Sequence, residues 1–197
     1  MRERLVLASG NAGKLRELEV LLAPLGFELI AQGTLGIEPV EESGTTFTAN
    51  ALLKAQHAAR ASGLGALADD SGLEVDALGG SPGVRSARYA GERASDQENL
   101  EKLLLELASC PPERRTARYR CVIVRVRGPA DPAPVVAEGT WEGRIATAAR
   151  GSGGFGYDPV FLPGGSTRTA AELTPQEKNA VSHRALALAA LRRALQR

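Results

Sequence analysis

Two adjacent carboxylates, Asp69 and Asp70, stand directly after an apolar segment of the sequence. A divalent cation shared with Glu41 or Glu42 would keep them ionised, because hard oxygen ligands suit Mg²⁺ and a polyphosphate bound to it. Without a cation, crowding would raise the pKa of one carboxyl group. Side chains alternate along a strand, so only one aspartate can face a given cleft, and we favour Asp70. The alternative is a turn in which an aspartate caps the following residues.

A second candidate is the segment Ser9-Gly10-Asn11-Ala12-Gly13-Lys14, which joins an apolar strand to a helix through small residues. The N–H groups and the dipole at a helix start favour an anion, so a phosphate would fit there beside Lys14. The segment is not a Walker loop, because its glycines have the wrong spacing and Leu15 replaces the magnesium-binding hydroxyl. A tight connection with a solvated lysine is the alternative.

Asn50 and Lys54 are four residues apart in a segment with helical spacing. They therefore share one helix face and could both reach toward the phosphate site. A solvated helix face is the alternative. His57, in the same segment, is interpreted as a partly exposed surface residue.

Residues 152–159 form a glycine-rich segment that contains Phe155 and Tyr157. Glycines let the backbone approach a flat ligand, and an aromatic ring can stack on a nucleobase. Lys178, His183 and Arg184 follow near the start of the last predicted helix, where their donors could bind a base carbonyl or a phosphate. The alternative for the glycine-rich segment is a flexible hairpin loop.

The elements that must position these residues follow from apolar periodicity and from capping signals. Helices are expected at 14–25, 47–62 and 95–107, in a short segment after the capping box at 174–177, and at 182–196. Strands are expected at 5–8, 27–30 and 66–68, with a long hairpin formed by 119–126 and 135–141. The aspartate pair would thus sit at a strand end. The opening strand, turn, helix and strand form a unit typical of α/β sheets.

The composition is that of an ordinary globular protein. The 197 residues are 43% hydrophobic and 24% charged, and we expect a single domain over 1–197. The formal net charge of +1 gives no reason to expect a nucleic-acid or membrane partner. No signal-type or membrane-spanning apolar run is present, so we expect a cytoplasmic protein, with Cys110 and Cys121 as reduced thiols.

Taken together, several blocks resemble the Ham1-type inosine triphosphate pyrophosphatases over nearly the whole chain and in that family's order. The first blocks are Ser9-Gly10-Asn11-Ala12-Gly13-Lys14, Glu41-Glu42-Ser43-Gly44-Thr45-Thr46-Phe47, Asn50-Ala51-Leu52-Leu53-Lys54-Ala55 and Ala68-Asp69-Asp70-Ser71-Gly72-Leu73. The later blocks are Gly79-Gly80-Ser81-Pro82-Gly83-Val84, Ser86-Ala87-Arg88-Tyr89, Gly153-Gly154-Phe155-Gly156-Tyr157-Asp158-Pro159, Ala171-Glu172-Leu173 and Ser182-His183-Arg184. Ser9 departs from the threonine of many relatives but keeps the hydroxyl.

The resemblance implies a magnesium-dependent homodimer that hydrolyses ITP, dITP and XTP to the nucleoside monophosphate and pyrophosphate, removing deaminated purines from the nucleotide pool. It implies an α/β fold with a mixed twisted sheet, flanking helices and two lobes around an active-site cleft. Asp70 would be the proton acceptor, with Lys54 as the second catalytic residue. The metal ligands would come from Glu41, Glu42, Asp69 and Asp70, with Glu41 favoured of the two glutamates. Substrate would contact Ser9, Gly10, Asn11, Ala12, Gly13, Lys14, Ser71, Phe155, Gly156, Tyr157, Asp158, Lys178, His183 and Arg184.

A second hypothesis, in which the protein is not an enzyme, is a nucleotide-binding sensor that uses the same turn and glycine-rich segment but does not hydrolyse the nucleotide. The aspartate pair argues against it. Carboxylates beside a polyanion add little to a pure binding site unless they hold a metal ion.

Overall fold

The computed structural model describes residues 3–23 and 26–196. The chain divides into two compact units, which are considered separately. The first comprises residues 1–70, 121–139 and 184–197, and the second comprises 71–120 and 140–183. Three long strands contribute residues to both units, namely β3 (Gly65–Val75), β4 (Thr116–Val126) and β5 (Val135–Ile145).

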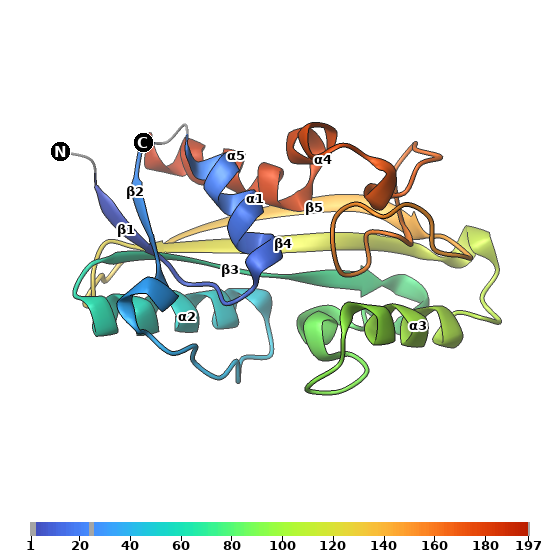
Figure 1. Cartoon of the computed structure of the whole chain (residues 1–197), viewed down its shortest axis with the longest axis horizontal. Helices are drawn as coiled ribbons and strands as arrows, with labels where there is room; N and C mark the ends of the chain where they lie inside the picture. Colours follow the sequence, from blue (N-terminus) through green and yellow to red (C-terminus); the bar gives the residue numbers. More distant parts are fainter. Residues whose placement is uncertain (1–2, 24–25, 197) are drawn as a thin grey trace. The chain divides into compact units, whose positions relative to one another are not determined.

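A single six-stranded sheet has the order β2-β1-β3-β4-β5-β6 (Figure 1). Its remaining strands are β1 (Arg4–Leu7), β2 (Glu28–Ala31) and β6 (Phe161–Pro163). Strand β1 is parallel to both β2 and β3, whereas β5 and β6 are antiparallel, so the sheet is mixed. The expected α/β class is confirmed, and β4 and β5 are hydrogen-bonded neighbours, as the hairpin prediction requires.

The first unit places helices on both faces of its strands. Helices α1 (Ala12–Leu22) and α5 (His183–Leu195) lie above the strands in Figure 1, and α2 (Phe47–Ser62) lies below them. On the α1 and α5 side, the core consists mainly of leucines from helices and strands, including Leu5, Leu7, Leu18, Leu22, Leu67, Leu188 and Leu191. Helix α2 buries a row of alanines, whose small side chains let a helix approach a sheet closely.

The helix ends follow the predicted signals. Thr46 caps α2 by accepting a hydrogen bond from the Ala49 N–H, and Gly63 ends the helix with a φ of 72°. Helix α1 begins earlier and ends earlier than predicted, and the predicted apolar position Leu25 lies outside the described residues.

One prediction about β3 is wrong. The strand does not end at the aspartates but runs on to Val75, so Asp69 and Asp70 lie in its middle and not in a turn. Both side chains are buried. A strand can carry two buried carboxylates only if cations or hydrogen-bond donors compensate them, and the site described below provides both.

The second unit is built around strand segments and short helices. Its α-helices are α3 (Asp96–Glu106) and α4 (Pro175–Val181), each opened by a capping box, as predicted. Its core gathers leucines, aromatic residues and valines, among them Leu103, Tyr119, Trp141, Val160 and Phe161. The described residues also form the 3₁₀ helices η2 (Gln32–Leu35), η3 (Asp76–Leu78), η4 (Gly83–Arg88), η5 (Pro112–Arg114) and η6 (Ala170–Glu172).

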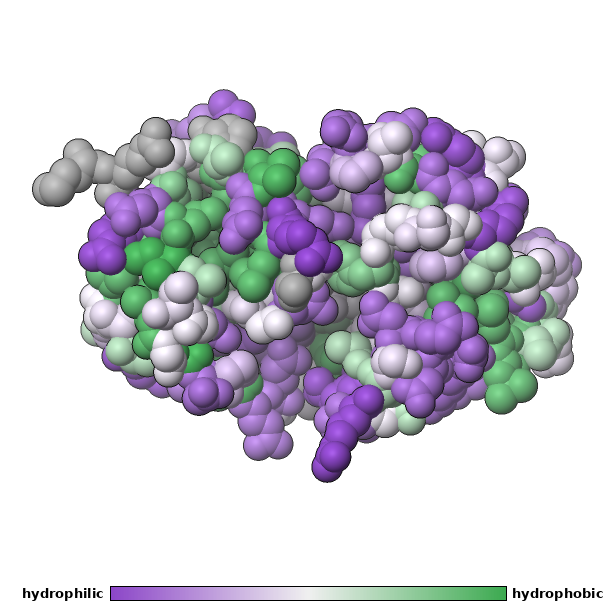
Figure 2. All heavy atoms as spheres, in the orientation of Figure 1, coloured by the Kyte–Doolittle hydropathy of each residue, from purple (hydrophilic) through white to green (hydrophobic). Residues whose placement is uncertain are grey.

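Hydrophobic and hydrophilic side chains are interspersed on the face shown in Figure 2. Within residues 3–23 and 26–196, no helix has the length and apolar character needed to cross a membrane.

Candidate active site

The predicted phosphate turn sits where β1 ends and α1 begins. Asn11 is the N-cap of α1, and its Oδ1 accepts a hydrogen bond from the Lys14 backbone N–H at 3.0 Å. The Asn11 N–H in turn points to Ser9 Oγ at 3.4 Å. Gly10 and Asn11 are exposed, so an anion can reach the turn from solvent.

Strand pairing brings this turn to the aspartates. Leu7 of β1 is the partner of Leu67 in β3, and the Ala8 N–H donates to the Leu67 carbonyl at 2.8 Å. The phosphate turn follows Leu7, and the aspartates follow Leu67, so parallel pairing places both at the same edge of the first unit. This juxtaposition joins two motifs that are far apart in the sequence.

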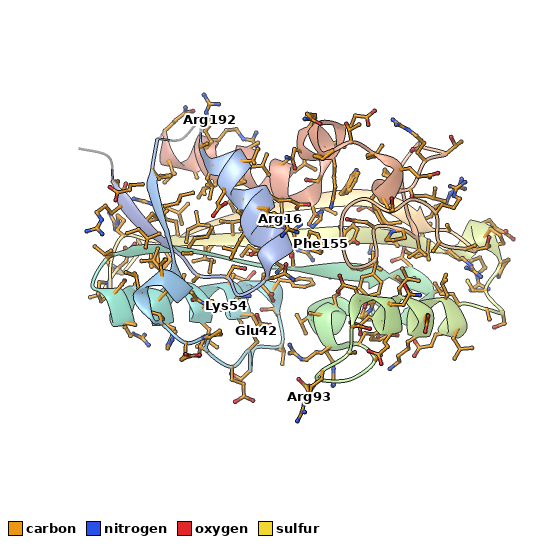
Figure 3. All side chains as sticks on the ribbon, in the orientation of Figure 1. Arg16, Glu42, Lys54, Arg93, Phe155 and Arg192 are labelled. Atoms are coloured by element: carbon orange, nitrogen blue, oxygen red, sulfur yellow. The ribbon has the colours of Figure 1, made fainter. Side chains whose placement is uncertain are left out.

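Asp70 lies on the α2 face of β3. Its Oδ1 is 3.1 Å from Lys54 Nζ, and its Oδ2 accepts a hydrogen bond from Asn50 Nδ2 at 3.2 Å. Lys54 Nζ also contacts Glu42 Oε1 at 2.6 Å (Figure 3). Burial raises the pKa of Asp70 and outweighs the opposing Lys54 cation, which makes the carboxylate a better proton acceptor.

Asn50 connects the acidic segment to Asp70. Its Oδ1 accepts the Gly44 N–H at 2.8 Å, while its amide nitrogen holds Asp70. The side chain is fully buried. The sequence placed Asn50 on the same helix face as Lys54 but did not indicate that it orders the segment containing Glu41 and Glu42.

Asp69 lies on the opposite face of β3, toward α1 and α5. Its Oδ2 is 3.1 Å from Lys14 Nζ and 3.8 Å from Arg184 Nε. Arg184 Nη1 contacts Glu17 Oε2 at 2.6 Å. Burial alone would raise the pKa of Asp69, but the Lys14, Arg184 and Lys54 cations together lower it to about 2. Sequence reasoning missed Glu17, although its position three residues after Lys14 places both on one helix face.

The second unit holds the glycine-rich segment. Asp158 Oδ2 accepts the Phe155 N–H at 2.9 Å and lies 2.6 Å from Lys178 Nζ, and that ammonium is 4.9 Å from the centre of the Phe155 ring. Gly154 has a φ of 71°, and a Cβ there would lie 2.0 Å from Asp158 Oδ2. Glycine is therefore required beside this carboxylate.

Two further contacts fix the same segment. The Gly156 N–H donates to Asp96 Oδ2 at 2.7 Å, and the Tyr157 hydroxyl donates to the Ser86 carbonyl at 2.8 Å. The Tyr157 side chain is buried, so it anchors the segment and leaves only its backbone to meet a ligand. Sequence analysis did not name Asp96 as a site residue, although the capping box that begins at Ser95 marks its place at the start of α3.

His183 and Arg184 are neighbours in sequence with different surroundings. The His183 ring stacks on Tyr119, with centroids 4.6 Å apart and planes 9° from parallel, and Trp141 lies 6.3 Å away. Arg184 belongs to the Asp69 and Glu17 cluster of the first unit. These contacts differ between the two residues, and their grouping in one ligand pocket stays a prediction.

The carboxylates of Asp70, Glu41 and Glu42 are the candidate ligands for a metal ion. Among the described residues, no group of three or more His, Cys, Asp or Glu side chains is arranged to hold one. Asp70 and Glu42 both contact Lys54, while Glu41 is exposed on the same segment. One or two carboxylates completed by substrate phosphate oxygens is the arrangement that Mg²⁺ commonly takes, so these residues fit that ion.

Comparison with known proteins gives the same family that the sequence blocks resemble. The sequence pattern of the Ham1 family matches residues 5–194. A dITP/XTP pyrophosphatase of Methylococcus capsulatus is 60% identical over 191 residues, covering 97% of this chain and 95% of that protein. A dITP/XTP pyrophosphatase of Salmonella typhimurium is 55% identical over 193 residues, covering 98% of each.

Solved structures with a similar fold lead to the same family. A HAM1 protein from Coxiella burnetii superposes with a TM-score of 0.90 at 48% identity, covering 98% of both chains. A nucleoside-triphosphatase, also described as a dITP/XTP pyrophosphatase, from Mycobacterium abscessus superposes with a TM-score of 0.76 at 46% identity, covering 95% of this chain and 97% of that one.

Proposed function

Because this chain belongs to the Ham1 family, we propose that it hydrolyses deaminated purine nucleoside triphosphates, namely dITP, ITP and XTP. The products are the nucleoside monophosphate and pyrophosphate, and the reaction removes deaminated purines from the nucleotide pool. The observation that carries the proposal is the alignment of the phosphate turn after β1 with the buried aspartates of β3, across the Leu7 and Leu67 pairing.

The triphosphate binds at the turn that opens α1. Backbone N–H groups of residues 10–14 and the helix dipole attract the phosphates, and the Lys14 ammonium adds a full positive charge. The Ser9 hydroxyl offers a further donor. Lys54 supplies a second cation on the Asp70 side of β3. Together these groups offset the charge that would otherwise repel an attacking water.

Asp70 acts as the general base. It orients a water molecule and accepts its proton as the water oxygen attacks the phosphorus nearest the ribose, and pyrophosphate leaves. Asn50 and Lys54 hold the two carboxylate oxygens in fixed directions. No covalent nucleophile is required. Ser71, the next residue of β3, contacts the substrate.

Mg²⁺ is the metal that we assign to this reaction. When bound, it would neutralise phosphate charge and polarise the scissile anhydride. Asp70 and one of the two glutamates would hold it. Glu42 contacts Lys54, so we assign the metal to the exposed Glu41 and a Lys54-orienting role to Glu42. Asp69 faces the other side of β3 and is left out of the metal set, which revises the expectation from sequence.

The second unit supplies the base contacts. Phe155 stacks on the purine, and Lys178 and His183 offer donors to its edge. The 6-oxo group of hypoxanthine or xanthine accepts from such a donor, whereas the 6-amino group of adenine cannot. A mispaired buried polar group costs about 1–3 kcal/mol, so two mismatches give roughly a hundredfold preference over ATP.

A substrate panel tests the proposal. The protein is incubated with Mg²⁺ and ITP, XTP, dITP, GTP or ATP, and the products are separated by ion-exchange chromatography. We expect monophosphate and pyrophosphate from ITP, dITP and XTP, with much slower turnover of ATP. Release of orthophosphate and IDP from ITP would contradict the reaction type. Binding of ITP with no hydrolysis at any Mg²⁺ concentration would favour the nucleotide sensor instead.

The proposal includes a homodimer in the cytoplasm. Light scattering after size-exclusion chromatography at several protein concentrations measures the assembly. A mass close to twice the 20.7 kDa of one chain is expected, and a concentration-independent mass of one chain would contradict the dimer.

A further inference from the structure

The two neighbouring aspartates of β3 point to opposite faces of the sheet and contact different residues. Asp70 contacts Lys54 and Asn50 from α2. Asp69 contacts Lys14 from α1 and Arg184 from α5. A metal ion held by Asp70 would lie on the α2 face of the strand, which the Asp69 carboxylate does not face.

The surroundings of Asp69 do not favour a dication. Its carboxylate contacts two cations, an ammonium 3.1 Å away and a guanidinium 3.8 Å away, whereas the Asp70 carboxylate contacts one ammonium and a neutral amide. Glu17, the other carboxylate of this cluster, contacts Arg184 at 2.6 Å. These contacts set cations against both carboxylates, and the cations would repel a metal ion at Asp69.

Lys14 is the member of the cluster that can meet a ligand. The side chains of Lys14 and Glu17 each retain 15% exposure, while those of Asp69 and Arg184 retain 0% and 3%. Of the two exposed side chains, only Lys14 carries the positive charge that attracts a phosphate. It is also the third residue of α1, beside the exposed turn. A lysine ammonium on a flexible chain loses much freedom when a phosphate orders it, so prior fixation by a buried carboxylate would favour binding.

We propose that Asp69 is a positioning residue that holds the Lys14 ammonium at the phosphate turn, and that it takes no part in binding the metal ion. Arg184 also contacts Asp69, and Glu17 in turn contacts Arg184. The inference rests on the proposed function in one respect, namely that Lys14 binds the triphosphate. It assigns the adjacent aspartates different tasks, with metal and base chemistry at Asp70 and phosphate affinity at Asp69.

Two matched substitutions test this assignment, because Asp69→Asn and Asp70→Asn make the same chemical change on opposite faces of one strand. The first readout is binding of inorganic tripolyphosphate in EDTA, measured by calorimetry. The second is the Mg²⁺ concentration that gives half-maximal ITP hydrolysis. We expect D69N to weaken metal-free binding about tenfold, as Lys14→Met does, and to leave the Mg²⁺ requirement unchanged. We expect D70N to retain metal-free binding and to alter the Mg²⁺ response.

The double variant D69N/K14M extends the test. If Asp69 acts through Lys14, the double variant binds tripolyphosphate no more weakly than K14M alone. A raised Mg²⁺ requirement in D69N, additive losses in the double variant, or unchanged metal-free binding by D69N would each overturn the proposal.

Glu17→Gln provides a second route if D69N does not fold. The change leaves Asp69 and Lys14 in place but removes the anion that holds Arg184, so the guanidinium competes with Lys14 for Asp69. We expect about threefold weaker tripolyphosphate binding with an unchanged Mg²⁺ requirement, and unchanged binding would overturn the proposal. If the wild type hydrolyses ITP but D69N and E17Q bind tripolyphosphate normally, only this inference fails. If the wild type binds no tripolyphosphate but hydrolyses ITP, this inference fails alone. If the wild type hydrolyses no ITP with Mg²⁺, the proposed function fails.

Discussion

The Asn50 side chain donates to the Asp70 carboxylate at 3.2 Å and accepts the Gly44 backbone N–H at 2.8 Å. One buried amide therefore ties the acidic segment before α2 to the proposed base on β3. Both of its polar ends are satisfied within the protein. An amide in this position fixes the Asp70 carboxylate in one orientation without adding charge to the site.

Asn50→Ala removes both hydrogen bonds and leaves the Asp70 oxygen and the Gly44 N–H without these partners. We expect a loss of about 1–3 kcal/mol in the free energy of unfolding, and a fall in kcat of about tenfold or more because Asp70 is less well oriented. Urea unfolding and steady-state ITP hydrolysis measure the two effects. Gln56→Ala, in the same helix, is the control, and a kcat as high as that of the control would show that Asn50 does not orient the base.

Asp70→Asn keeps the size of the side chain but removes the proton acceptor. We expect kcat for ITP to fall by about 10²–10⁴, with little loss of nucleotide binding measured by equilibrium dialysis. Near-normal turnover would exclude Asp70 as the base. A loss confined to binding would assign it a purely electrostatic role.

Gly154→Ala tests the contact between the glycine-rich segment and Asp158. The added Cβ would lie 2.0 Å from Asp158 Oδ2, so the Asp158 carboxylate that contacts the Phe155 N–H and Lys178 must shift. Gly165→Ala is the matched control, because Gly165 has a similar φ of 76° but nothing within 4 Å of the added atom. Both changes impose a backbone cost of roughly 1 kcal/mol. Only Gly154→Ala is expected to raise KM for ITP, by about tenfold or more; equal KM values would separate this segment from substrate.

Lys178→Met removes the donor that we assign to the purine edge. We expect the ratio of kcat/KM for ITP to that for ATP to fall about tenfold or more, because the preference for a 6-oxo group is lost. The variant also leaves Asp158 buried without its cation, so its thermal unfolding is measured alongside. Gln176→Ala, on the exposed side of α4, is the control. An unchanged ratio in a folded variant would remove Lys178 from base recognition.

Much of this fold was predictable from local signals. The capping boxes at Ser95 and Thr174 and the glycine stop at Gly63 set helix ends, and the structure follows them. Strand alternation also implied that only one of Asp69 and Asp70 could face a given cleft. These are effects of neighbouring residues, which a sequence displays directly.

The errors arose where partners are distant in the chain. A strand continues through two aspartates because Lys14 and Arg184 compensate one carboxylate and Lys54 compensates the other. Nothing within a few residues of the pair reveals those cations, so the sequence favoured a strand that ends at the aspartates. The Tyr157 hydroxyl likewise donates to the Ser86 carbonyl of a distant segment, and the sequence does not reveal that contact.

The central claim is that water attacks the phosphorus nearest the ribose while pyrophosphate leaves. Hydrolysis of ITP in ¹⁸O-labelled water, with mass spectrometry of both products, measures this directly. The account predicts one labelled oxygen in inosine monophosphate and none in pyrophosphate. Label found in pyrophosphate, or orthophosphate and IDP as the products, would contradict it.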